Sequence, residues 1–63
     1  MGNLKTYETF CRGNINENEI IKIKIFTDEF ISENEIEQIN NMRLCDVQGM
    51  RKIRGWQVFV INN

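Results

Sequence analysis

Residues 19–26 have the sequence E-I-I-K-I-K-I-F. Within this stretch three isoleucines alternate with Lys22 and Lys24, and a period of two is typical of a β-strand with one buried and one wetter face. The β-branched isoleucines predict a core stripe, and the lysines opposite them discourage edge-to-edge aggregation. The segment therefore predicts a strand of a sheet with a single well-defined core side.

A helix is predicted directly after this strand, over residues 33–42. Ser32 and Glu35 form a capping-box pattern, in which the hydroxyl accepts from the backbone N–H of residue 35 and the carboxylate reaches back to the cap. Ile31 before the cap and Ile36 inside the helix have the spacing of a hydrophobic staple.

The N-terminal stretch, residues 4–11 (L-K-T-Y-E-T-F-C), predicts another strand because Thr and aromatic residues favour a pleated, half-buried surface. Tyr7, Thr9 and Cys11 share one face of it. Residues 12–14 (R-G-N) supply turn chemistry, since Gly and Asn tolerate positive φ.

The C-terminal third can be interpreted in two ways. Residues 43–48 (R-L-C-D-V-Q) return to an extended pattern, and residues 49–50 have glycine at the first central position of a two-residue turn. A long strand over 51–62 would follow, with Gly55 at a bulge or close approach. The alternative is a seven-residue loop before a shorter strand, 56–61.

Both interpretations give the order β-β-α-β-β in one small domain, residues 1–63. The expected fold class is α+β: a four-stranded, mainly antiparallel sheet with one helix packed on one face. Chains of this length have a thin margin of stability and usually need good packing, a crosslink, a metal or a partner.

One short helix of about 15 Å can cover only one face of such a sheet. The last strand is nevertheless apolar on both sides, with Trp56 and Val58 on one side and Phe59 and Ile61 on the other. A homodimer, a partner protein or the N-terminal strand would have to cover the second face. We therefore predict Phe59 and Ile61 as the oligomer face.

The composition excludes several chemistries. The chain has no histidine and two cysteines, so it lacks the four Cys/His ligands of a structural zinc site, and no histidine can activate Cys11 or Cys45. The glycines form no phosphate-binding motif. We expect no catalytic residues, no metal, no cofactor and no enzyme activity.

Cysteine usage and targeting signals bear on the compartment. The favoured interpretation is two reduced thiols in a cytoplasmic protein, and a Cys11–Cys45 disulfide is the alternative. No apolar run is long enough to span a bilayer, so we expect no membrane partner. Gly2 and Thr6 match the short N-myristoylation pattern, which is a weak signal.

Two charged segments are candidate binding surfaces. Residues 28–37 contain five carboxylates and no cation, and they predict an acidic partner-binding helix face made of Asp28, Glu29, Glu33 and Glu37. In size and charge the chain resembles small acidic inhibitors of phages and mobile elements, including some anti-CRISPR and anti-restriction proteins. No residue motif is matched to any family.

The second candidate surface is basic and lies in the C-terminal hairpin: Arg51, Lys52, Arg54 and Trp56. Cations neutralise phosphates and an aromatic ring can stack on a base, so this hairpin predicts partner or nucleic-acid contacts. The simpler interpretation is that Trp56 anchors the core and the cations solubilise a hairpin tip.

The lead functional hypothesis is a small non-enzymatic protein that acts by protein–protein binding, as a homodimer or a subunit. A regulator or inhibitor of phage or mobile-element type fits it. The alternative is a nucleic-acid-binding module that uses the basic hairpin.

Overall fold

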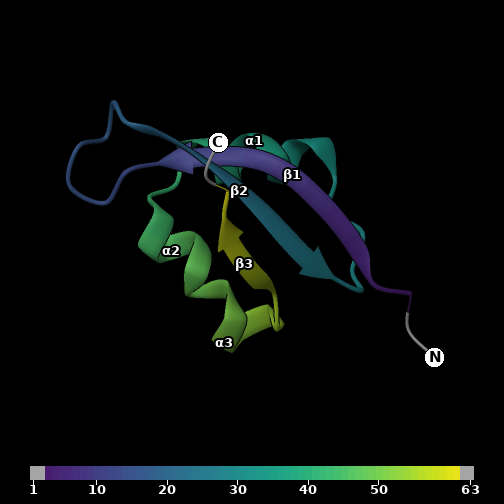
Figure 1. Ribbon diagram of the computed structural model, residues 1–63. Coiled ribbons are helices and arrows are strands. Elements are labelled where there is room, and N and C mark those ends of the chain that lie inside the picture. Colours follow the sequence, from purple (N-terminus) through teal and green to yellow (C-terminus); the bar gives the residue numbers. More distant parts are fainter. Residues whose placement is uncertain (1–2, 62–63) are drawn as a thin grey trace.

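The computed structural model describes residues 3–61 (Figure 1). Along the chain the elements are β1 (Lys5–Arg12), β2 (Ile20–Thr27), α1 (Glu33–Asn41), α2 (Leu44–Gln48), α3 (Met50–Arg54) and β3 (Gln57–Val60). The strands form one antiparallel sheet in the order β1-β2-β3, with β2 in the centre. The N-myristoylation pattern at Gly2 lies outside the described residues.

The core lies on one face of this sheet. Ile23 and Ile25 of β2 are completely buried, and they share a cluster with Ile39 of α1, Val47 of α2 and Trp56 before β3. Because the helices contribute to the same cluster as the odd-numbered residues of β2, they cover the same face. Figure 1 shows α1 behind β1 and β2.

The two predicted N-terminal strands are confirmed. β1 and β2 pair along their whole length, with Tyr7 opposite Ile25 and Cys11 opposite Ile21. The phenol of Tyr7 accepts a hydrogen bond from the Ile31 N–H at 3.0 Å. This contact fixes the segment that leads from β2 to α1 against the first strand.

The predicted helix and its cap are confirmed, but only half of the capping box forms. Ser32 is the N-cap and its hydroxyl accepts from the Glu35 N–H at 3.3 Å. The Glu35 carboxylate binds Arg54 instead of reaching back to residue 32. A charged partner from distant sequence thus replaces the local half of the motif.

The prediction of four strands and one helix is wrong, because residues 44–48 and 50–54 are helical and the sheet has three strands. Leu44, Val47 and Met50 are three residues apart, and all three pack on the core, which a helix allows and a strand does not. The N–H of Cys45 in the first turn of α2 donates to Asn14 Oδ1 at 2.7 Å. The β1–β2 loop therefore supplies a cap for this helix.

Gly49 and Gly55 also differ from their predicted roles. Gly49 has φ −62° and ψ −20°, so it continues a helical path from α2 to α3 and forms no hairpin turn. Gly55 has φ +73° and ends α3 in the left-handed conformation, with its N–H donating to the Arg51 carbonyl at 3.1 Å. It is a helix C-cap and not a strand bulge.

The cysteines do not form the alternative disulfide. Cys11 is buried in the core, Cys45 is exposed on α2, and both are free thiols. Burial raises the pKa of the Cys11 thiol, which disfavours the reactive thiolate.

We expect Gly55→Ala to lower the free energy of unfolding by about 1 kcal/mol more than Gly49→Ala does, because of these two glycines only Gly55 has a positive φ. A Cβ at residue 55 would meet no atom within 4 Å, so the cost is conformational and not steric. Urea unfolding of both variants measures the difference. Equal stabilities would contradict the assignment of Gly55 as a left-handed cap.

Candidate functional site

Within residues 3–61 no helix covers the second face of the sheet. Strand register places the even-numbered residues of β1 and β2 and the odd-numbered residues of β3 on it: Phe10 lies opposite Lys22, and Phe59 lies opposite Lys24. The sequence-based expectation that one helix layer leaves a second face uncovered therefore agrees with the structure. We call this surface the open face.

Large apolar side chains are exposed on the open face. Phe59 is 53% exposed, Ile20 51% and Phe10 38%. Phe26 packs edge-to-face on Phe59, with ring centroids 5.6 Å apart. Ile61 continues the apolar surface beyond β3, and its N–H donates to the Lys22 carbonyl at 2.9 Å. The open face thus exposes several large apolar side chains to solvent.

A shallow depression of about 300 Å³ lies across the strands of the open face. Its lining includes Phe10, Ile20, Lys22 and Ile61. Two predicted contact positions are involved in this surface, because Ile61 lines the depression and Phe59 lies farther along the same face. Residues from all three strand regions converge here, although they are far apart in the sequence.

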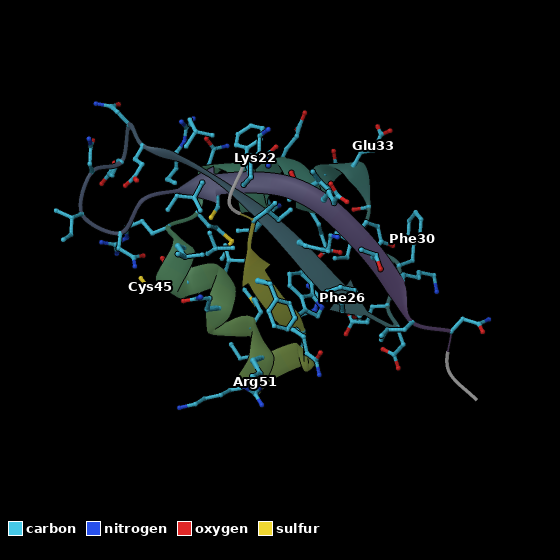
Figure 2. The ribbon with its side chains drawn as sticks, in the orientation of Figure 1. Lys22, Phe26, Phe30, Glu33, Cys45 and Arg51 are labelled. Atoms are coloured by element: carbon cyan, nitrogen blue, oxygen red, sulfur yellow. The ribbon has the colours of Figure 1, made fainter. Side chains whose placement is uncertain are left out.

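Cations interrupt the apolar surface. Lys22, labelled in Figure 2, is exposed, and Lys24 Nζ lies 3.6 Å from the Glu8 carboxylate on the neighbouring strand. Register also places Arg12 on this side, opposite Ile20. The open face therefore combines aromatic and aliphatic groups with three cations and one carboxylate.

The part of the acidic candidate surface that α1 carries, Glu33 and Glu37, lies on the opposite layer of the molecule. Asp28, Glu33 and Glu37 are exposed, as is Phe30 among them, whereas Glu29 is half-buried in an ion pair (Figure 2). Since α1 packs on the core side of the sheet, its carboxylates and the cations of the open face are separated by the body of the domain.

The basic candidate surface does not assemble as predicted. Trp56 is 1% exposed and belongs to the core, as the simpler interpretation expected. Arg51 and Lys52 are exposed on α3, where Figure 2 labels Arg51. Because residues 51–54 are helical, these cations and Trp56 do not share the strand face that nucleic-acid binding required.

Arg54 is held inside the molecule by two carboxylates. Its Nε donates to Glu29 Oε1 at 3.0 Å, and its Nη1 donates to Glu35. Its guanidinium carbon lies 4.6 Å from the centroid of the Trp56 ring, within cation–π range. The Arg54 clamp, formed by these four residues, ties the end of α3 to the start of α1.

The clamp shifts the pKa values of Glu29 and Arg54. Hydrogen bonds from Arg54 hold the pKa of Glu29 below its usual range, against an opposing effect of desolvation. The indole N–H of Trp56 contributes to the same lowering, although its buried Nε1 makes no hydrogen bond of regular geometry. The two carboxylates raise the pKa of Arg54 above its already high value.

No metal-binding group of three or more His, Cys, Asp or Glu side chains occurs within residues 3–61. In the same range there is no helix long and apolar enough to cross a membrane. Comparisons with protein-family models, curated proteins and solved structures found no match for this chain.

Three positions of the open face were not predicted as contacts: Phe10, Ile20 and Phe26. The alternation of residues 4–11 already placed Phe10 opposite the core face, and Lys22 and Lys24 marked the same side of the next strand. Combining the two patterns across the predicted hairpin would have located this part of the surface. Its β3 part depended on the pairing of the last strand with β2, which only the structure shows.

We expect Glu29→Gln to lower stability at pH 7, because Arg54 then loses its charged partner. The lowered pKa of Glu29 stabilises the fold above the usual carboxyl range, and this contribution disappears as pH falls through the lowered value. Urea unfolding from pH 7 to pH 3 should therefore show the variant and the wild type converging in acid. A constant difference across that range would contradict a role for the Glu29 charge.

Proposed function

We propose that this chain is a small non-enzymatic binding protein that acts on a protein partner through its open face. The proposal rests on the exposure of Phe10, Ile20 and Phe59 on a sheet face that no helix within residues 3–61 covers. A regulator or inhibitor of phage or mobile-element type is the role that its size and charge favour. The free thiols of Cys11 and Cys45 support a reducing compartment such as the cytoplasm.

Burial of this surface supplies the driving force for binding. Each Phe or Ile side chain fully removed from water contributes about 1.5–3 kcal/mol, and aromatic residues are enriched where interfaces are most buried. Lys22 and Lys24 provide the flanking charge, so the partner should present apolar groups with carboxylates beside them.

The same cations disfavour face-to-face pairing of identical copies. Lys22 and Lys24 lie on the central strand, and a two-fold axis over β2 would bring the lysines of both copies together. Like charges brought into an interface cost free energy unless carboxylates compensate them. Glu8 is the one carboxylate that register places on this face, so a different protein fits better than a second copy.

We expect Phe59→Ser to abolish capture of the partner, and Phe30→Ser to preserve it. Both rings are exposed, Phe59 at 53% and Phe30 at 75%, but only Phe59 lies on the open face. The wild type and the two variants are immobilised at equal density. The proteins that each of them retains from the native cell extract are quantified by mass spectrometry. Binding partners that all three proteins retain equally would contradict the proposal, as would a partner lost only with Phe30→Ser.

A second candidate function is single-stranded nucleic-acid binding by the same face. Phe10, Phe26 and Phe59 lie among three cations, and aromatic side chains on a sheet can stack on bases. The carboxylates of α1, which would repel phosphate, lie on the other layer. The aliphatic Ile20 and Ile61 fit an apolar protein surface better, so this function ranks second.

For this second function we expect binding of a fluorescent dT20 oligonucleotide at low salt and its loss in a Lys22→Glu, Lys24→Glu double variant. Three neutralised phosphates give a slope of about −2 for log affinity against log salt concentration, following single-strand counterion release. Fluorescence anisotropy between 20 and 200 mM salt measures it. No binding at 20 mM salt would rule out this candidate.

A further inference from the structure

The outer edge of β3 is an unpaired strand edge. Phe59 pairs with Lys24, and the Ile61 N–H donates to the Lys22 carbonyl, so the odd-numbered residues of this strand direct their backbone groups toward β2. In an antiparallel pair the alternate residues point the opposite way. The N–H and C=O groups of Val58 and Val60 therefore face outward, and within residues 3–61 no other hydrogen bond reaches them.

The outer edge of β1 is different because other parts of the chain bind it. The Arg12 N–H donates to the Met42 carbonyl at 2.8 Å, and the Asn40 side-chain amide donates to the Phe10 carbonyl at 2.7 Å. Covering and charging an edge are the usual ways to prevent strand addition. Within residues 3–61 no other segment donates to or accepts from the outward backbone groups of Val58 and Val60, and a groove separates them from the neighbouring helices and Arg51.

A groove of about 380 Å³ lies beside this edge, between β3 and the α2–α3 helices. Its walls include Gln48 and Arg51 from the helices and Val58 and Phe59 from the strand. In Figure 1, α2 and α3 lie on the side of β3 away from β2, and α2 contacts β3. Arg51, which lines the groove, and its sequence neighbour Lys52 are exposed, and neither has an ion-pair partner in the described part of the chain.

We propose that β3 receives an extended segment of a partner protein as a fourth strand, with a carboxylate of that segment against Arg51. Main-chain hydrogen bonds to residues 58 and 60 provide affinity, and the groove selects side chains on alternate positions of the incoming strand. The proposal rests on the proposed function, since it names the second contact that a protein partner makes. Phe59 is shared by the groove and the open face, which makes the two contacts continuous.

Charge decides between this occupant and a second copy of the chain. Pairing of two β3 edges across a two-fold axis would bring the Arg51 side chains of both copies toward each other, because Arg51 lies beside the edge. An acidic extended segment instead neutralises Arg51. The exposed valine at residue 60, 42% exposed, adds apolar surface for the neighbouring strand.

The test uses a random heptapeptide library displayed on phage and selected against the immobilised full chain. Selected peptides are synthesised, and their affinity is measured for the wild type and for Val60→Pro, Val60→Thr, Arg51→Ala and Phe10→Ser. Proline at residue 60 removes the outward N–H of an edge strand, where proline is tolerated, and threonine keeps it. Circular dichroism and thermal melting establish that each variant is folded.

We expect the selected peptides to be acidic, with apolar residues at alternate positions. They should bind Val60→Thr and Phe10→Ser with the affinity that they have for the wild type, and they should bind Val60→Pro at least tenfold more weakly. Arg51→Ala should weaken the same peptides several-fold. Equal binding to both Val60 variants would overturn the proposal, as would selection of no peptide. A dimer in sedimentation that Val60→Pro dissociates would also overturn it, because the occupant is then a second copy.

Hydrogen exchange in the wild type gives an independent measurement if Val60→Pro does not fold. The Val58 and Val60 amides should exchange rapidly in the free protein and slowly with a selected peptide bound, and unchanged exchange would overturn the proposal. If Phe10→Ser is the only variant that weakens peptide binding, the proposed contact at the β3 edge is overturned, and the proposed contact at the open face is still supported. Retention of the cellular partner by Phe59→Ser contradicts the proposed function whichever peptides are selected.

Discussion

The central strand β2 can bury only one of its faces, and the rest of the structure follows from that constraint. Its core residues Ile23 and Ile25 alternate with Lys22 and Lys24, whose ammonium groups cannot enter a core without partners. All three helices must therefore pack on the isoleucine side. Within residues 3–61 no helix or strand covers the lysine side, which stays open with the phenylalanines that its neighbours place there.

The parts of the fold that depend on local sequence could be predicted. β1, β2 and α1 follow from strict alternation and from the Ser32 cap, which act over a few residues. The C-terminal third could not be predicted in the same way, because Cys45 and Val47 fit a period of two while Leu44, Val47 and Met50 fit a helix. The cap that Asn14 supplies to α2 comes from distant sequence and gives no local signal.

One missed element did have a local signal. Residues 51–55, R-K-I-R-G, carry cations in the last turn before a glycine, which is the pattern of a helix C-terminus, where the dipole favours positive charge. Interpreting Arg54 and Trp56 as a nucleic-acid surface required a strand here. In the helix, Arg54 instead turns inward onto Glu29 and Glu35. The most strongly basic stretch of the sequence thus loses one of its cations to internal structure.

The replacement of a predicted strand by α2 and α3 also explains why the third strand has a free edge. A strand at 43–48 would have been available to pair within the sheet, whereas the helices that form there place Val47 in the core and leave residues 58 and 60 without a neighbour. The open face and the open edge therefore have a single origin, because the chain uses its last segments to complete one core. What remains is a sheet with one apolar face and one unpaired edge, joined at Phe59, and a partner that covers both buries more surface than either would alone.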